Sequence, residues 1–284
     1  MIPPSMELVE RLLREDVPSL DLTTQLLELP QAPALLTLTT RTPVTVAGAA
    51  IAQALCEYVG AEVEQLAPSG SDVPAGSVLL SAHATPAALH RVWKVVVNVY
   101  ESACGIATRT RALVTAAKAG SPRVEVFTTR KVIPGTKDLA VSAILAGGAL
   151  PHRLGLSETV LIFDQHTIFI GGVAGLARRL ELIRHRAVEK VVFAEVSTFD
   201  DAVVLAEAGV GGLQFDKVPA AELGPMVSSL RDEYPALRLI AAGGINPQNA
   251  GDYAATGVHA IASSWMYSGP VADVSARIAP TESI

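Results

Sequence analysis

After residue 120 the sequence alternates between apolar, β-branched runs and helical patterns, and this alternation restricts the fold more than any other feature. Strands that alternate with helices pair in parallel through right-handed crossovers. The runs are continuously apolar, which favours a (β/α) barrel over a sandwich. Eight strands are not visible, so we expect an α/β fold with an incomplete barrel of six to seven parallel strands. The expected strands are 123–127, 159–163, 190–196, 212–215, 238–242 and 260–263, and the expected helices are 137–146, 173–185, 200–208, 220–233 and 247–256.

The first 110 residues have a less regular pattern, and a chain of 284 residues is long enough for two domains of about 100–200 residues each. Ser5 can cap a first helix whose apolar side chains form one stripe. Strands are expected at 37–41, 45–47 and 78–81, and helices at 49–58 and 87–118. The sequence therefore predicts a separate N-terminal domain before the barrel.

The composition favours a soluble cytoplasmic enzyme. Half of the residues are apolar and only 18% are charged, so the chain can bury a large core and an oligomer interface. The net charge of −6 argues against a general nucleic-acid binder. No apolar run is long enough to span a membrane, and the N-terminus has no secretory signal pattern. Cys56 and Cys104 lie far apart in apolar segments, which predicts buried thiols rather than a disulfide or a metal site.

Two pairs of basic residues lie in the same half of the expected barrel, whose active sites lie at the carboxyl ends of the strands. Arg130 and Lys131 follow the first strand and present a fork and a point charge to one anion. His152 and Arg153 follow a Gly-Gly turn and can bind a carboxylate or a phosphate. The alternative interpretations are an ordinary solvated loop and a structural histidine.

Two acidic residues stand at the ends of consecutive expected strands. Glu195 follows Val-Val-Phe-Ala, and Asp216 follows Gly-Leu-Gln-Phe, so we expect their carboxylates side by side at the barrel mouth. Such a pair can hold ribose hydroxyls, coordinate Mg²⁺ or stabilise an oxocarbenium-like transition state. The alternative is ordinary ion pairing with Lys217 or Lys190.

A glycine pair carries the clearest physical signal. Gly243 and Gly244 follow a strand, with Asn246 at the expected N-cap and Pro247 in the first helical turn. Bare backbone N–H groups at such a position form a cradle for phosphate. A tight turn without a ligand is the alternative.

Together these residues resemble the nicotinate-nucleotide pyrophosphorylase family, also called quinolinate phosphoribosyltransferase. The matching segments follow the family's order along nearly the whole chain. They are 15–16, 21–24, 102–108, 129–135, 147–148, 152–156, 160–166, Glu195, Asp216 and 243–245. The resemblance implies an N-terminal α/β sandwich at 1–110 and the incomplete barrel at 111–267, with residues 268–284 packing back on the sandwich. It also implies a homodimer, or a larger assembly, whose active sites borrow residues across the interface.

The resemblance further implies a reaction. The family transfers phosphoribosyl from phosphoribosyl pyrophosphate to a ring nitrogen and releases pyrophosphate, with Mg²⁺ as cofactor. The resemblance assigns catalysis to Glu195, Asp216 and Lys131, and it implies that the two acids bind Mg²⁺. It places Lys94, Arg130, His152, Arg153 and Phe163 at the acceptor, and Gly243, Gly244 and Ser264 at the 5′-phosphate.

Several positions depart from the family pattern. Lys94 replaces the arginine donated by the neighbouring subunit, and Phe163 replaces a substrate-binding lysine. Pro151, Ala242 and Ser264 replace asparagine, serine and glycine. These variants look most like the ModD branch, pyrophosphorylases associated with molybdenum-transport genes, whose reaction the resemblance does not settle. They predict an acceptor with less negative charge or more apolar surface than quinolinate.

Two other function classes remain as alternatives. One is a phosphate-binding or nucleotide-binding protein of the same fold that has lost turnover, against which the intact Glu195 and Asp216 count. The other is a barrel enzyme with different chemistry on a phosphorylated substrate, against which the whole-chain match counts. The sequence does not identify the acceptor.

Overall fold

The computed structural model describes residues 3–281 and divides into two compact units. The first unit comprises Met1–Arg111, Ile133–Gly148 and Tyr267–Ile284, and the second comprises Ala112–Val132 and Ala149–Met266. Residues 133–148 group with the first unit, whereas the expected division at residue 110 assigned them to the barrel. Residues 282–284 of the expected C-terminal tail lie outside the described residues.

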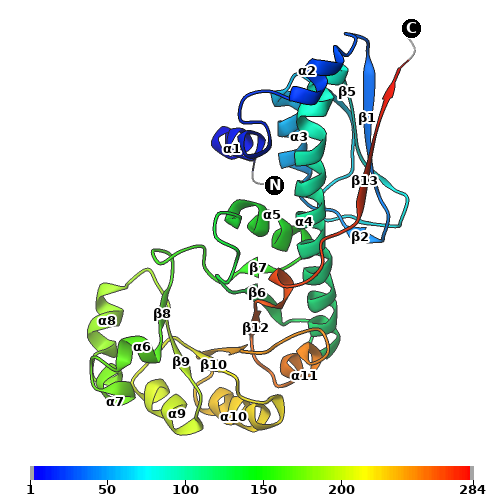
Figure 1. Ribbon diagram of the computed structural model, residues 1–284. Helices are drawn as coiled ribbons and strands as arrows, with labels where there is room; N and C mark the ends of the chain where they lie inside the picture. The colour runs from blue at the N-terminus through cyan, green and yellow to red at the C-terminus, as the bar shows by residue number, and fades with distance from the viewer. Residues whose placement is uncertain (1–2, 282–284) are drawn as a thin grey trace. The chain divides into compact units, whose positions relative to one another are not determined.

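The second unit contains a seven-stranded, wholly parallel sheet in the order β7-β6-β12-β11-β10-β9-β8. Its strands are β6 (Glu125–Thr128), β7 (Leu150–Pro151), β8 (Val160–Ile162), β9 (Val192–Val196), β10 (Gly212–Asp216), β11 (Arg238–Ala242) and β12 (Ala260–Ser263). Within residues 3–281 no ladder joins the edge strands β7 and β8, so the barrel is incomplete. This confirms the predicted fold class. Helices α9, α10 and α11 lie outside the curled sheet (Figure 1).

The register of these strands defines an inner face. Ile240 and Ala242 of β11 cluster with Phe127 and Phe193. Gln214 pairs with Ile240 and Asp216 with Ala242, so both polar residues of β10 share that face. The inner face is therefore apolar in the middle and polar at the carboxyl ends of β9 and β10.

The helices of the second unit are α6 (Asp164–Thr167), α7 (Gly172–Ala177), α8 (Leu180–Arg186), α9 (Phe199–Glu207), α10 (Ala220–Glu233) and α11 (Ala250–Ala255). The single helix expected at 173–185 is wrong, because α7 and α8 are separate. The Arg179 guanidinium donates to the Gly175 carbonyl at 3.1 Å. The backbone N–H of Arg179 donates to the Leu176 carbonyl, three residues back, instead of to the carbonyl four residues back that an α-helix would use. None of the helices described in residues 3–281 is both long and apolar enough to cross a membrane.

The first unit is an antiparallel sheet in the order β13-β1-β5-β3 with helices against it. Its strands are β1 (Ala34–Thr40), β3 (Glu62–Leu66), β5 (Val78–Ala84), β13 (Val274–Pro280) and the short pair β2 (Val44–Thr45) and β4 (Asp72–Val73). Its helices are α1 (Met6–Asp16), α2 (Leu22–Leu27), α3 (Ala49–Tyr58) and α5 (Lys137–Gly147), while α4 (Pro86–Gly120) continues into the second unit. The Ser5 hydroxyl caps α1 as predicted.

Large buried side chains and both cysteines form the core of the first unit. The Tyr100 hydroxyl, fully buried, donates to the Leu79 carbonyl at 3.3 Å. Cys56 and Cys104 are buried free thiols, as predicted. Burial raises the pKa of Cys56 to about 12 and that of Cys104 to about 11, so neither is a reactive thiolate at physiological pH.

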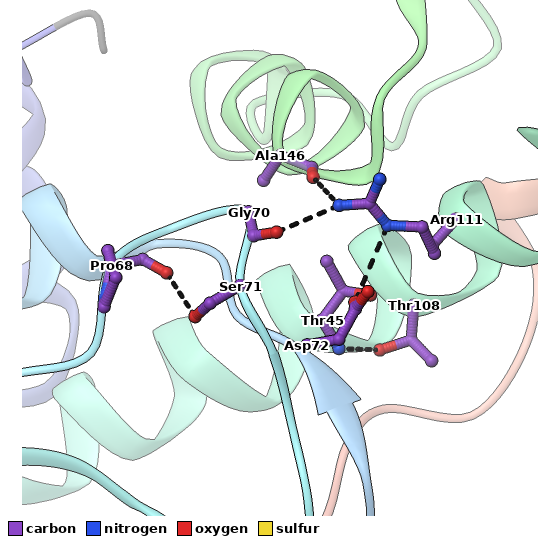
Figure 2. A network of polar contacts seen from close by, with 8 residues as sticks. All are labelled: Thr45, Pro68, Gly70, Ser71, Asp72, Thr108, Arg111 and Ala146. Carbon is purple, nitrogen blue, oxygen red and sulfur yellow. Dashed lines mark hydrogen bonds and ion pairs between the residues drawn. The ribbon is translucent and has the colours of Figure 1, made fainter.

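Arg111 connects three segments of the first unit (Figure 2). Its Nη2 donates to the carbonyl oxygens of Gly70 at 2.9 Å and Ala146 at 3.2 Å. Its Nε lies 3.6 Å from the Asp72 carboxylate, which also accepts from the Thr45 hydroxyl at 2.6 Å. The end of α5 is thereby tied to the loop before β4.

Candidate active site

Glu195 and Asp216 lie on the inner face of the sheet but at different levels. Glu195 pairs with Gln214, so Asp216 stands two residues further along β10. The expected range 190–196 has the correct end, because β9 continues to Val196, which pairs with Phe215; the placing of Glu195 as the last residue of its strand is wrong. The two acids therefore sit in successive layers of one face.

The Glu195 carboxylate is half-buried and hydrogen-bonded. Gln214 Nε2 donates to its Oε2 at 2.8 Å. Burial raises the pKa of Glu195 most strongly, and the charges of Asp216 and Asp164 raise it further, while the Gln214 hydrogen bond and Lys217 lower it. Two further carboxylates, those of Asp216 and Asp164, thus lie close enough to act on Glu195 at this end of the sheet.

Asp216 makes the ion pair that the alternative interpretation proposed. Its Oδ2 lies 3.2 Å from the Lys217 ammonium, whose side chain is 80% exposed. Because the lysine of this pair is largely in solvent, the pair contributes little to stability. It therefore leaves both groups available to a ligand.

Arg130 and Lys131 lie in an exposed loop after β6. Neither side chain has a hydrogen-bond or ion-pair partner among residues 3–281. The Arg153 guanidinium carbon lies 5.6 Å from the centre of the Phe163 ring, a cation–π contact. Burial and the nearby charge of Arg130 lower the pKa of Arg153. The loops therefore bring Arg130 and Arg153 close enough to repel each other.

His152 is held against the inner face. Its amide donates to the Thr128 carbonyl at 3.0 Å, and its ring meets Phe127 edge-on at 5.8 Å between centres. Burial and the charge of Arg153 lower its pKa, so the ring is neutral at physiological pH. The buried Thr128 hydroxyl has no hydrogen-bond partner among residues 3–281.

Both glycines after β11 have a left-handed backbone, with φ of 89° at Gly243 and 69° at Gly244. A Cβ on Gly243 would lie 2.7 Å from the Lys217 amide and 2.8 Å from Asp216 Oδ1, whereas one on Gly244 would meet nothing within 4 Å. Gly243 is therefore required by the packing of the β10 end. The space beside Gly244 is open.

The turn after the glycines differs from the expectation. The helix begins at Ala250, not at Pro247, and Asn249 takes the N-cap position predicted for Asn246. The Asn246 side chain accepts from the Gln248 amide at 2.9 Å instead, which closes a separate turn. The Asn249 side-chain Nδ2 donates to the Gly244 carbonyl at 3.2 Å, which fixes the glycine turn.

Ser264 and Lys94 take different places. Ser264 directly follows β12 at the carboxyl end of the sheet and is half-buried. Its neighbour Ser263, which sequence reasoning missed, donates to the Ile245 carbonyl at 2.6 Å and pins the glycine turn to β12. Lys94 is exposed on α4 and belongs to the first unit.

Two other groups at the carboxylates were missed. Gln214 was detectable as a polar residue two positions before Asp216 in an otherwise apolar strand, hence on the same face. Asp164 directly follows Phe163, but its proximity to Glu195 depends on the pairing of β8 with β9.

Mg²⁺ suits the donor atoms of this site. The ion prefers oxygen ligands and is usually held by one or two carboxylates together with substrate phosphates. Glu195 and Asp216 supply two such carboxylates on one face. Within residues 3–281 no group of three or more His, Cys, Asp or Glu side chains is placed to hold a metal alone, so substrate oxygens would complete the coordination.

The chain is similar to known proteins over most of its length. Residues 21–104 match the N-terminal domain and residues 106–277 the C-terminal domain of quinolinate phosphoribosyl transferase. A Rhodobacter capsulatus protein, provisionally named pyrophosphorylase ModD, is 39% identical over 84% of this chain and 92% of its own length. The human nicotinate-nucleotide pyrophosphorylase [carboxylating] is 28% identical over 85% of this chain and 80% of its own. The solved nicotinate-nucleotide pyrophosphorylase of Francisella tularensis shares the fold, with a TM-score of 0.87, 23% identity and coverage of 96% and 95%.

Proposed function

Because the chain belongs to the quinolinate phosphoribosyl transferase family, a family of pentosyltransferases, we propose that it transfers phosphoribosyl from phosphoribosyl pyrophosphate to a ring nitrogen of a heteroaromatic acid. The observation that carries this proposal is the pair of inner-face carboxylates, Glu195 and Asp216, with cations in the loops of the same unit. A site that only bound phosphate would need the cations without the acids.

In the proposed reaction the ring nitrogen of the acceptor forms a bond to C1 of the ribose. The bond from C1 to the pyrophosphate oxygen breaks, and pyrophosphate leaves with that electron pair. Positive charge develops on the ribose as the bond breaks, and negative groups fixed nearby stabilise it. Asp216 and Glu195 supply this negative charge.

The cationic side chains bind the anionic groups of the two substrates. Lys131 neutralises the leaving pyrophosphate, and Arg130 and Arg153 bind the carboxylate of the acceptor. His152, neutral and wedged against Phe127, offers a ring nitrogen for hydrogen bonding. Gly243 and Gly244, with Ser264, hold the 5′-phosphate through backbone N–H groups and a hydroxyl.

When bound, Mg²⁺ would neutralise charge on the pyrophosphate oxygens. Glu195 and Asp216 would hold it.

The acceptor is proposed to carry less charge or more apolar surface than quinolinate. Phe163 presents a ring where a cation would meet a second carboxylate, and Arg153 lies over that ring. Loss of one charge-assisted hydrogen bond, worth about 1.5–3 kcal/mol, weakens a dicarboxylate by roughly 10–100-fold. Phe163→Lys with Lys94→Arg should therefore raise quinolinate turnover. Quinolinate use by the unmodified chain with ordinary family efficiency would contradict this.

Lys94 enters the proposal through assembly. We propose a homodimer in which Lys94 of one protomer serves the site of its partner, an arrangement that a high apolar share of the sequence favours. Mixing inactive Lys94→Ala and Glu195→Ala chains should restore part of the activity through hybrid sites. A fully active monomer would rule this out.

The proposed function is tested by pyrophosphate release. The protein is incubated with phosphoribosyl pyrophosphate, Mg²⁺ and a panel of pyridine carboxylic acids, with Asp216→Asn as the matched control. Release that needs both an acid and Asp216 supports the proposal. Binding of phosphoribosyl pyrophosphate without release from any acid would favour a binding protein that has lost turnover. The molybdenum link of the ModD resemblance stays a prediction, which growth on limiting molybdate tests.

A further inference from the structure

A cavity of about 600 Å³ opens beside α6, directly after β8. Its lining residues come from α6 and the segment leading into α7; they are Asp164, Gln165, Thr167, Ile168, Phe169 and Gly172. All of them belong to the second unit. The volume falls within the range of roughly 300–1,000 Å³ that small-molecule sites occupy.

The cavity has two large apolar side chains that the fold does not bury. Ile168 is 73% exposed and Phe169 is 86% exposed, although they are adjacent in the sequence. Thr167 beside them is buried, and its hydroxyl donates to the Asp164 carbonyl at 3.3 Å. Both side chains line the cavity, and a mainly apolar lining with a few polar groups is typical of a small-molecule site.

The cavity adjoins the proposed reaction centre. β8 pairs with β9 with Ile162 opposite Ala194, so the next residues, Phe163 and Glu195, stand beside each other. Asp164 follows directly, and its charge acts on Glu195. The cavity and the catalytic carboxylates therefore share Asp164 as a neighbour.

Charge decides which part of a substrate fits here. Asp164 on the lining repels a carboxylate, whereas Arg130 and Arg153 attract one. Phe163 joins the two areas, because its ring lies under the Arg153 guanidinium and is stacked at 21° on His166 of α6, with 5.8 Å between centres. A flat acid held by Arg153 would lie beside Phe163 and His166, and Ile168 and Phe169 follow His166 by two and three residues.

We propose that Ile168 and Phe169 form a specificity subsite for an uncharged, apolar part of the acceptor, such as a second fused ring. This inference rests on the proposed function and names the substrate class of the same site. The acceptor is then a heteroaromatic acid with one carboxylate and more ring surface than a single pyridine.

The test compares one-ring and two-ring acids by calorimetry. Pyridine-3-carboxylate and quinoline-3-carboxylate are titrated into the intact chain and into the double variant Ile168→Ser/Phe169→Ser, without phosphoribosyl pyrophosphate. Because an aromatic contact buried by the ligand is lost, the affinity of the double variant for the two-ring acid should fall at least about tenfold. Its affinity for the one-ring acid should fall by less than about twofold. Val188→Ser, at another side chain that is 86% exposed, is the matched control and should change neither affinity.

Two results would overturn the inference. One is equal affinity of the intact chain and the double variant for the two-ring acid, including no binding to either. The other is a change in sedimentation of the double variant with unchanged acid affinities, which would make this surface an interface between copies of the chain. An affinity contrast without pyrophosphate release from any acid would instead support the subsite and refute the proposed function.

Discussion

The acids and the cations of the candidate site are held in different ways. Glu195 and Asp216 stand on paired strands, and Glu195 accepts a hydrogen bond from Gln214. Arg130 and Lys131 stand in an exposed loop, and among residues 3–281 their side chains have no hydrogen-bonding partner. Strand pairing fixes the backbone positions of the two acids in the sheet. The exposed loop does not fix the cationic side chains, so a ligand would order them.

This difference separates two tasks. Groups that stabilise a transition state must be in place before the reaction, because reorganisation during it would add to the barrier. Groups that capture an anion can be ordered on binding, at a cost in side-chain entropy. We therefore expect substitutions of the acids to lower the rate and substitutions of the cations to lower affinity.

The largest expected effect is on the rate, from Glu195→Gln. The amide keeps the size of the side chain and can still accept from Gln214, but it removes the negative charge. We expect kcat to fall about 10²–10³-fold. The affinity for phosphoribosyl pyrophosphate should stay nearly unchanged when it is measured without Mg²⁺, because Glu195 is a proposed ligand of that ion. Steady-state kinetics with calorimetry would measure both. A tenfold loss of affinity at an unaltered kcat would assign Glu195 to binding.

The glycine turn sharpens the comparison, because Gly243 packs on the strand end and Gly244 faces open space. Gly243→Ala would push against Asp216 and Lys217, so affinity for phosphoribosyl pyrophosphate should drop at least about tenfold. Gly244→Ala meets no neighbour and shares only the backbone strain of about 1–2 kcal/mol. Calorimetry and thermal unfolding of both variants would separate the effects. Equal loss of affinity would contradict this account.

Two arginines extend the comparison to stability. Arg111 is bound by three segments of the first unit, whereas Arg130 is left exposed. Arg111→Met should lower the free energy of unfolding by about 1–3 kcal/mol, because it leaves the Asp72 charge and two carbonyls without their donor. Arg130→Met should change it by less than about 0.5 kcal/mol. Urea unfolding measures both, and a reversed order would break the distinction.

The smallest effect is a pH dependence of stability. The pKa of Glu195 is raised in the folded state, so the folded protein holds a disfavoured carboxylate above that pKa. Glu195→Gln should therefore be more stable than the wild type at neutral pH. The advantage should vanish as the pH falls below the ordinary glutamate pKa of about 4.3, where both states are protonated. A melting-temperature difference that is independent of pH would contradict the raised pKa.

Much of the barrel was predictable because its signals are local. The expected ranges 220–233, 238–242 and 260–263 coincide with α10, β11 and β12. The helix at 49–58 coincides with α3 for the same reason. In each segment the apolar pattern agrees with the element that tertiary packing selects.

Elements that depend on distant partners were not predicted. β13 pairs with β1 although nearly the whole chain separates them in sequence, as in Arg277 opposite Thr37. Apolar and polar residues alternate only weakly within β13 itself. β3 carries Glu62 and Glu64 at the edge of its sheet, where exposure hides the apolar pattern. Strand propensity at such edges is decided by pairing rather than by composition.

The residues of the candidate site could be predicted, but the positions of Glu195 and Asp216 relative to each other along the sheet could not. The rule that barrel sites lie at strand ends selected both acids. The offset between Glu195 and Asp216 depends on the register of β9 against β10, which no local pattern encodes. The same register brings Gln214 to Glu195, and the pairing of β8 with β9 brings Asp164 there.

The separation of tasks is tested most directly by measuring kcat and KM side by side for Asp216→Asn and Arg130→Met. Both variants are assayed with the same acid, Mg²⁺ and phosphoribosyl pyrophosphate by pyrophosphate release. We predict that Asp216→Asn lowers kcat about 10²–10³-fold. We predict that Arg130→Met instead raises KM for the acid about 10–100-fold with a smaller change in kcat. A KM effect for Asp216→Asn together with a kcat effect for Arg130→Met would contradict the account.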